Sequence, residues 1–449
     1  MKPTHITVIG AGLAGSLLGT ALARRGHRVT LYEKRPDLRR VEISAGRSIN
    51  LALANRGIHA LEQVGVMDRV RPLLIPMAGR MLHHPGGERQ FVSYGNKPHE
   101  VIYSVSRGGL NGILMDAAVA HGRTEILFEH SCVGVDLEAR TIEVDTPQGR
   151  TSAGWEVLIG TDGSVSTVRD AILAESSGSL REEPLGHGYK ELSIPPGPGG
   201  TFAMETNALH IWPRGELMLI ALPNPGGSFT VTLFLPNQGE ESFASISDPL
   251  ALREFFQKRF ADAVPLLPNL EEEYFGNPTG HLETIRCWPW MDREALILGD
   301  AAHAIVPFHG QGMNAAFEDC SELASCIDHS SGEWSDVFEE LSRRRKPNAE
   351  AIADMALENY VEMRSTVLDP KFTLRKETGF RLEEEFPDRF IPRYSMVMFH
   401  LLAYSEAQRR GAIQKEILEL VTADADSLDE VDFDLARRLV LERLDPFSA

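Results

Sequence analysis

The sequence has few of the features that mark a secreted, metal-binding or disulfide-bonded protein. Only four of its 449 residues are cysteines, and no two of them form a CxxC pair: Cys132, Cys287, Cys320 and Cys326. This spacing suggests neither a zinc site nor a disulfide framework. We therefore expect reduced, mostly buried thiols and no bound metal.

Long apolar runs are also missing. The longest one near the C-terminus, from Met396 to Tyr404, is interrupted by His400 and is too short to cross a bilayer. The first residues, MKPTHITVIG, lead directly into a predicted strand and lack the layout of a signal peptide. The sequence thus predicts a cytoplasmic protein without a transmembrane anchor.

Positive charge is scarce. Lys and Arg number 45 against 64 Asp and Glu, which gives a net charge of -19. Such a chain repels nucleic acid unless a local basic patch exists. The basic run at 343–346, RRRK, is interpreted as the end of a helix. We expect no nucleic-acid partner.

The first 34 residues predict a βαβ unit. An apolar strand, His5–Ile9, is followed by a glycine-rich turn, a helix over Leu17–Arg24 and a second strand over Arg28–Lys34. Such a unit implies a parallel sheet with right-handed crossovers.

The turn of this unit reads Gly10-Ala11-Gly12-Leu13-Ala14-Gly15, a GxGxxG motif between a strand and a helix. Gly10 permits the tight turn, Gly12 admits a pyrophosphate to the backbone, and Gly15 lets helix and strand pack closely. Glu33 follows 18 residues after Gly15, where an acid can bind ribose hydroxyls. The motif predicts dinucleotide binding but does not separate NAD from FAD, and a tight turn without ligand is the alternative.

Downstream, the pattern changes from mixed to β-rich to helical. Short strands are predicted at Val101–Val105 and Val157–Ile159, an antiparallel sheet over 186–235, and mostly helix from about Asp336 onward. We expect a discontinuous first domain (1–75, 101–180 and 280–330), a second domain (76–100 and 181–279) and a helical C-terminal domain (331–449).

One later stretch resembles a second ligand-binding turn. Residues 299–314, GDAAHAIVPFHGQGMN, place Asp300 at a strand end and glycines on the way into a helix. Asp300 could simply cap the next segment. The backbone N–H groups of a helix start free of bulky side chains can instead face a flat or anionic group.

The GxGxxG, the Asp162-Gly163 pair and the Gly299-Asp300 pair occur in the order found in flavoprotein aromatic hydroxylases, which the chain resembles. The resemblance implies that FAD is bound, with Asp300 on its ribityl chain. It also implies roles in cofactor binding for Gly10, Gly12, Leu13, Ala14, Gly15, Glu33, Arg107, Asp162, Gly312, Met313 and Asn314. Gly108-Gly109 departs from the charged pair usual in the family and puts local helix stability in doubt.

Longer blocks narrow the resemblance to the kynurenine 3-monooxygenase family, over Ile6 to about residue 415. These blocks are GRSINLAL, HGYKEL, ALHIWP, SFTVTLFLP, VPFHGQGMN, ALENYVEM and RFIPRYSMVMF. The resemblance implies an α/β protein, in which a Rossmann-like FAD-binding domain holds an inserted antiparallel β-sheet substrate domain and a helical C-terminal region completes the substrate pocket. It further implies hydroxylation of L-kynurenine to 3-hydroxy-L-kynurenine in tryptophan catabolism, with NADPH and O₂ through a flavin hydroperoxide.

The same resemblance assigns residues to the substrate. Arg80 and Tyr94 match residues on the amino-acid carboxylate, and Asn359 and Tyr394 match further substrate contacts. The remaining matches wall the aromatic ring or, for His309, offer a proton relay or carbonyl contact: Ile220, Phe234, Pro307, Phe308 and His309. From the residues alone, Arg80 reads as an exposed surface arginine, Tyr394 as a core aromatic and His309 as a satisfied core histidine.

Asn359 has support of its own, because it shares one helical face with Ile352, Met355 and Met363. A buried amide there needs partners, which backbone groups could also supply. Trp288 and Trp290 are interpreted as packing residues. An FAD monooxygenase for another anthraniloyl or phenolic acid, or a non-catalytic FAD-binding protein, remains an alternative, and a homodimer is possible.

Overall fold

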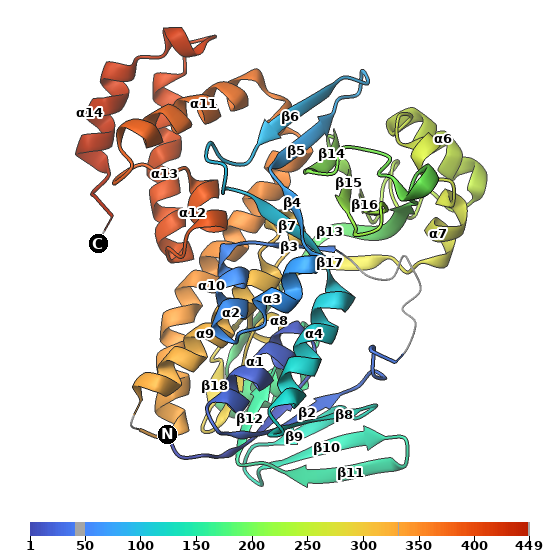
Figure 1. Cartoon of the computed structure of the whole chain (residues 1–449), viewed down its shortest axis with the longest axis vertical. Helices are drawn as coiled ribbons and strands as arrows, with labels where there is room; N and C mark the ends of the chain where they lie inside the picture. Colours follow the sequence, from blue (N-terminus) through green and yellow to red (C-terminus); the bar gives the residue numbers. More distant parts are fainter. Residues whose placement is uncertain (41–49, 331, 448–449) are drawn as a thin grey trace. The chain divides into compact units, whose positions relative to one another are not determined.

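In a computed structural model, residues 1–40, 50–330 and 332–447 are described, and the chain divides into two units (Figure 1). The first unit comprises 1–75, 103–187 and 279–353, and the second comprises 76–102, 188–278 and 354–449. The first four residues of the GRSINLAL block, 46–49, lie outside the described residues. Among the residues described, no helix combines the length and apolarity needed to span a bilayer.

The first unit is built on a mostly parallel sheet with strand order β18-β19-β12-β1-β2-β8. Its strands are β1 (His5–Ile9), β2 (Arg28–Glu33), β8 (Thr124–Phe128), β12 (Val157–Gly160), β18 (Met291–Asp292) and β19 (Ala295–Ile297). Only the edge strand β18 pairs antiparallel within it. The predicted parallel βαβ unit is confirmed, and its helix α1 (Leu13–Arg24) begins four residues earlier than expected.

The strands of this sheet are apolar and buried, since helices and a small sheet over residues 131–154 pack in the same core. Ile6, Val8, Leu158 and Leu296 are fully buried and share one core with residues of the helices. The helices and the smaller strands of this unit are α2 (Asn55–Gln63), α3 (Met67–Val70), α4 (Arg107–Ala120), α5 (Thr167–Ser176), α8 (Asp300–His303), α9 (Gly312–His329), β3 (Asn50–Leu53), β7 (Ile102–Ser106), β9 (Ser131–Asp136), β10 (Thr141–Thr146), β11 (Gly149–Gly154) and β17 (Gly280–Trp288).

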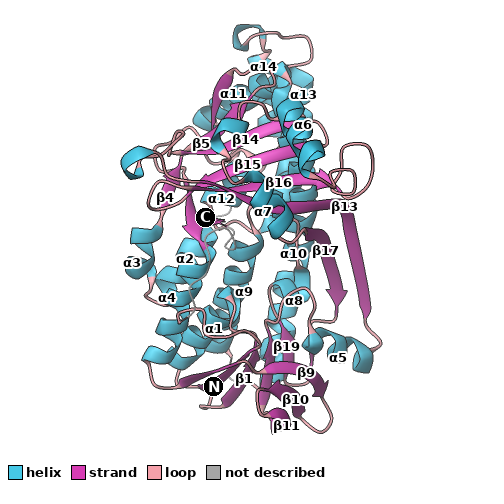
Figure 2. Ribbon diagram, turned by 90° about the vertical axis from the view of Figure 1, so that its right-hand side faces the viewer, coloured by secondary structure: helices cyan, strands magenta, loops and turns pink. Residues whose placement is uncertain are grey.

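The second unit contains a sheet in which β13, β16, β15, β14, β5 and β6 follow one another (Figure 2). Their bounds are β5 (Gly79–His83), β6 (Arg89–Ser93), β13 (Ser179–Ile194, entering this unit at Gly188), β14 (Ala208–Arg214), β15 (Leu217–Pro223) and β16 (Phe229–Pro236). The expected antiparallel pairing holds between β14, β15 and β16. The sheet also includes β5, which lies outside the range 186–235 and pairs parallel with β14.

Helices pack around both parts of this unit. The helices α6 (Pro249–Arg259) and α7 (Leu270–Gly276) supply Phe255, Phe256 and Leu270 to a core shared with the sheet. At the C-terminus, α11 (Pro370–Glu385), α13 (Tyr404–Val421) and α14 (Phe433–Arg443) share a second core, and α12 (Arg393–Phe399) contacts α13. A separate helical domain over 331–449 was expected, whereas residues 354–449 group with the sheet and 332–353 with the first unit.

The RRRK run does not end a helix, and this interpretation was wrong. It lies inside α10 (Trp334–Arg364), which continues through Pro347. Arg345 is buried there and donates to Asp319 and Glu318 at 2.7 and 2.6 Å, and Lys346 pairs with Glu350 one turn on. These charges are neutralised by side-chain partners, so they need no helix C-terminus.

Candidate active site

The glycine-rich turn is closely packed at two positions and open at the third. Gly10 has φ of +96°, and a Cβ there would lie 2.5 Å from the carbonyl oxygen of Thr161. A Cβ on Gly15 would lie 1.9 Å from the carbonyl oxygen of Gly10, whereas a Cβ on Gly12 would meet nothing within 4 Å. The space at Gly12, ahead of the N–H groups of Leu13 and Ala14 at the start of α1, fits the pyrophosphate of a dinucleotide.

Glu33 lies at the end of β2, directly beside this turn. Its carboxylate is buried and accepts hydrogen bonds from the N–H of Ala11 at 2.9 Å and of Arg35 at 3.0 Å. The two backbone donors fix an acceptor at the position that the ribose hydroxyls of a dinucleotide would approach.

Asp162 lies in the loop before α5 and binds its first turn, and Arg107 begins α4. Asp162 accepts from the Ser166 hydroxyl at 2.6 Å and from the Thr167 N–H at 2.9 Å, and burial raises the pKa of its carboxyl group. Arg107 is exposed as the first residue of α4, which Ser106 caps. The helix runs through Gly108 and Gly109, so the departure from the family pattern does not interrupt it.

The Gly299-Asp300 turn rests on a buried ion network that the sequence did not predict. Asp319 of α9 accepts hydrogen bonds from the Gly299 N–H at 3.0 Å, from His303 at 2.6 Å and from Arg345 at 2.7 Å. Burial by itself raises the pKa of Asp319, but His303 and Arg345 outweigh it and lower this pKa to about 2. Asp319 therefore holds a permanent charge that fixes the turn, with Asp300 exposed on it as the first residue of α8.

The start of α9 offers backbone donors. The N-cap residue, Gln311, makes no capping hydrogen bond through its side chain, and the helix begins Gly312-Met313-Asn314. The Asn314 side chain is occupied elsewhere, since it accepts from the Ala54 N–H and donates to the carbonyls of Ala52 and Gly310. What α9 can present to a ligand is therefore its first N–H groups and the positive end of its dipole.

Pro307, Phe308 and His309 form a short 3-10 turn just before α9. Phe308 and His309 are buried, and Pro307 is exposed. The structure thus places these three residues in the first unit, on the segment that joins Asp300 to the start of α9. The wall and relay roles expected of them stay predictions.

In the second unit, Arg80 of β5 is buried rather than exposed, so the reading from the residues alone was wrong. Only 6% of its surface is accessible, and its guanidinium donates to Glu362 at 2.7 Å and to the Asn359 amide oxygen at 3.4 Å. Burial lowers the pKa of Arg80, but the Glu362 carboxylate and two tyrosines more than compensate, so its pKa rises. Arg80 remains a buried cation.

Two stacked tyrosines lie beside this guanidinium. The rings of Tyr94 and Tyr394 stack with centroids 5.2 Å apart, and the Arg80 Cζ lies 5.7 and 5.3 Å from the two centroids. Among the described residues, the buried Tyr94 hydroxyl and the buried Arg80 Nε have no hydrogen-bond partner. Buried donors of this kind point to a missing acceptor, and a carboxylate is the group that guanidinium and phenol bind best.

Ile220 and Phe234 lie on the same face of the sheet as Arg80. Strand pairing matches Arg80 with Leu209, Ile211 with Ile220 and Met218 with Phe234, and paired residues share a face. The opposite face carries Trp212, Leu219, Val231 and Leu233 of the core. Asn359 is buried on α10 with Ile352, Met355 and Met363. Its amide oxygen accepts a hydrogen bond from Arg80, which lies on this face of the sheet.

Sequence reasoning missed Glu362 and Lys376. Glu362 lies one helical turn beyond Asn359, a spacing that could have revealed it. Lys376 on α11 donates to the Ser93 carbonyl, next to Tyr94, and no pattern in the sequence pointed to it. Of the two tryptophans interpreted as packing residues, Trp290 is buried, as expected, whereas the side chain of Trp288 is 43% exposed.

Comparison with known proteins assigns the chain to a family. The FAD-binding domain family matches residues 3–187 and 267–356. A kynurenine 3-monooxygenase of Myxococcus xanthus (strain DK1622) is 48% identical over 446 residues, covering 98% of this chain and 96% of that protein. The chain belongs to the kynurenine 3-monooxygenase family. A second family member, from Stenotrophomonas maltophilia (strain K279a), is 46% identical over 439 residues and covers 95% and 94% of the two chains.

Two solved oxygenase structures share this fold. A 2-methyl-3-hydroxypyridine-5-carboxylic acid oxygenase superposes with a TM-score of 0.67 at 19% identity, covering 82% of this chain and 95% of that one. The p-nitrophenol 4-monooxygenase of Pseudomonas putida DLL-E4 reaches 0.65 at 17% identity, covering 97% and 99%. The fold class expected from the sequence is confirmed, and the chain is a flavoprotein monooxygenase.

Proposed function

We propose that the protein hydroxylates L-kynurenine to 3-hydroxy-L-kynurenine in tryptophan catabolism, with FAD bound and NADPH and O₂ as co-substrates. The observation that carries the proposal is the buried Arg80 beside two stacked tyrosines, with donors on Arg80 and Tyr94 that have no hydrogen-bond partner among the described residues. The relatives at 46–48% identity are named for this activity. The amino-acid end of kynurenine carries the carboxylate that these donors require.

The second unit would hold the substrate by its polar end. Arg80 binds the carboxylate as a fork, Tyr94 adds a phenol donor, and Asn359 and Tyr394 complete the polar contacts. Ile220 and Phe234, on the same sheet face, offer an apolar surface for the aromatic ring. For Pro307 and Phe308 we propose contact with the aromatic ring, and for His309 contact with the carbonyl or a proton relay.

The first unit would hold FAD. The open space at Gly12, the acceptor on Glu33 and the N–H groups at the start of α9 fit its pyrophosphate, ribose and ring edge, and Arg107, Asp162 and Asp300 would bind along it. When bound, FAD supplies the redox chemistry that passes electrons from NADPH to O₂. The N-terminus of α9 stabilises negative charge placed against it.

The chain itself would orient the substrate and exclude water from the site. The aniline nitrogen of kynurenine already donates electron density to the ring carbon beside it, so the substrate needs little acid–base help. Fixing that carbon at the cofactor converts an encounter into a near-unimolecular step, and apolar walls keep water from consuming activated oxygen.

Product analysis tests this function. The FAD-loaded protein is incubated with L-kynurenine, NADPH and air. The products are then separated by chromatography and identified by mass spectrometry. We expect a product one oxygen atom heavier that co-elutes with 3-hydroxykynurenine. Turnover with another anthraniloyl or phenolic acid but not with kynurenine would favour the related monooxygenase, and no NADPH oxidation with any of them would favour a non-catalytic FAD-binding protein.

A further inference from the structure

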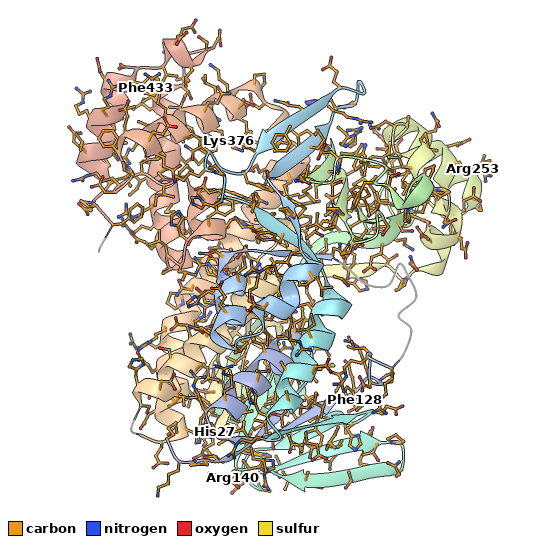
Figure 3. The ribbon with its side chains drawn as sticks, in the orientation of Figure 1. His27, Phe128, Arg140, Arg253, Lys376 and Phe433 are labelled. Carbon is orange, nitrogen blue, oxygen red and sulfur yellow. The ribbon has the colours of Figure 1, made fainter. Side chains whose placement is uncertain are left out.

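Lys376 lies inside the second unit, beside the arginine and tyrosines that would hold the substrate. It is on α11, labelled in Figure 3, and its Nζ donates to the carbonyl oxygen of Ser93. Ser93 is the strand partner of Gly79 and directly precedes Tyr94, and Gly79 directly precedes Arg80. The amine of Lys376 therefore lies at the pair of strand residues that directly precede Arg80 and Tyr94.

A second contact of α11 holds the turn that follows β6, at residues 94–100. Glu383, two helical turns after Lys376, is buried and pairs with Lys97. The turn is also closed from within, because the buried Glu100 carboxylate accepts from the N–H groups of Asn96 and Lys97 at 3.0 and 3.1 Å. Because α11 contacts both the end of β6 and the turn after it, Lys376 has a defined position relative to Arg80 and Tyr94.

The charges around Arg80 match a zwitterion. Arg80 is already paired with Glu362, so the two together carry no net charge. An α-amino acid with its carboxylate on Arg80 and its ammonium on Glu362 keeps that balance. An acid without the α-amine brings one net negative charge into buried surroundings, which is costly unless another cation accompanies it.

Lys376 can supply that cation near neutral pH. Burial, with a smaller contribution from Arg80 on β5, lowers the pKa of Lys376 to about 7 against the opposing effect of Glu362 on α10. The phenols of Tyr94 and Tyr394 have pKa values raised above their ordinary range, chiefly by burial, and stay neutral. On its own helix, the neighbouring ring is Phe380, 5.6 Å from the Nζ.

We propose that Lys376 is a specificity-determining residue of the substrate site. With its ammonium charged, the site accepts aromatic keto acids that lack an α-amine. With its amine neutral, the site is restricted to zwitterionic amino acids. The inference rests on the proposed function in one respect, namely that Arg80 and Glu362 receive the carboxylate and ammonium of the substrate.

Calorimetric titration of the FAD-loaded protein tests the inference without catalysis. The ligands are L-kynurenine and 4-oxo-4-phenylbutanoate, which keeps the aryl ketone and carboxylate but has neither amine. For the latter, Kd is expected to rise on the order of tenfold between about pH 6 and about pH 8, since its binding retains one proton on Lys376. The Kd of L-kynurenine is expected to change by less than about twofold over the same range.

Substitutions separate charge from structure. Lys376→Met is expected to hold the Kd of the keto acid at its high-pH value throughout, and Lys376→Arg to hold it at the low-pH value. Lys371→Met is the matched control, because Lys371 is on the same helix and also donates to backbone carbonyls, those of Thr422 and Ala423. This control is expected to keep the pH dependence of the unmodified protein.

The inference is overturned if the keto acid binds with a pH-independent Kd to the unmodified protein. It is also overturned if Lys376→Arg retains the pH dependence, a comparison that stands even should Lys376→Met fail to fold. Failure of both ligands to bind at any pH would overturn it as well. Hydroxylation of kynurenine, measured separately, then decides whether the proposed function stands.

Discussion

The guanidinium of Arg80 donates a 2.7 Å hydrogen bond to the carboxylate of Glu362, across 282 residues of sequence. The contact joins β5 to α10 within the second unit. Because Glu362 offsets the charge of Arg80, the arginine can stay ionised and buried while its Nε has no partner among the described residues. A site prepared in this way is ready for a ligand that brings its own pair of charges.

Replacing Arg80 should affect the substrate and spare the cofactor. We expect Arg80→Ala to weaken L-kynurenine binding by about 2–5 kcal/mol, because the carboxylate loses its charged partner and Glu362 is left unpaired. Equilibrium titration measures the Kd, and the flavin absorbance of the purified protein measures FAD content. Arg89→Ala, on the exposed neighbouring strand β6, should change neither. Loss of FAD from Arg80→Ala would show that Arg80 belongs to another site.

Replacing Tyr94 by Phe should weaken substrate binding without lowering the stability of the protein. The buried hydroxyl of Tyr94 has no hydrogen-bond partner in the part of the chain that the structure describes, so Tyr94→Phe should leave the thermal midpoint unchanged or slightly raised. The same change should weaken kynurenine binding about ten- to hundredfold, the value of one hydrogen bond to a charged group. Differential scanning fluorimetry and titration measure the two effects. A lowered midpoint with unchanged Kd would contradict the assignment.

The two glycines of the nucleotide turn should respond differently to alanine. Gly15→Ala forces a Cβ to 1.9 Å from a backbone oxygen, so it should destabilise the FAD-free protein and abolish FAD binding. Gly12→Ala meets no protein atom, so the fold should survive. Its FAD affinity should fall at least about tenfold, or about 1.4 kcal/mol, because the methyl group occupies the space for the pyrophosphate. Flavin fluorescence titration distinguishes the two.

Asp319 should control both stability and acid resistance of the first unit. Asp319→Asn removes the carboxylate that His303 and Arg345 share, although Arg345 keeps its pair with Glu318, and we expect a loss of about 3–5 kcal/mol in the free energy of unfolding at neutral pH. Asp328→Asn, which removes a surface pair with Arg25, should cost no more than about 1 kcal/mol. Urea titrations with the two variants and the parent compare these values.

The pH dependence of that contribution has a definite sign. The pKa of Asp319 is about 2 in the folded protein and about 3.9 in the unfolded chain, so its stabilisation is complete above the higher value. It should fall away by about 2–3 kcal/mol as the pH drops through the lower one. Urea titrations from about pH 5 to about pH 2 should show this loss in the parent and not in Asp319→Asn. Parallel curves for the two proteins would contradict the role of Asp319.

The sequence by itself determined the features that depend on neighbouring residues. Strand, turn and helix around Gly10–Gly15 follow from apolar periodicity and glycine placement, and so does the buried face of α10 that carries Asn359. Family motifs added the cofactor and the substrate class. The fold class and the FAD-binding family could therefore be predicted before any coordinates were known.

Tertiary structure alone decided which distant groups meet. Arg80 reads as a surface residue in its local stretch, and only strand register and the packing of α10 bury it against Glu362. The RRRK run reads as a helix end, whereas in the fold it is a helix interior in which Arg345 is buried against carboxylates of α9. Lys376 reaches the site because α11 packs on the turn after β6. The physical reason is that the energy of a buried charge depends on partners hundreds of residues away, which local periodicity does not encode.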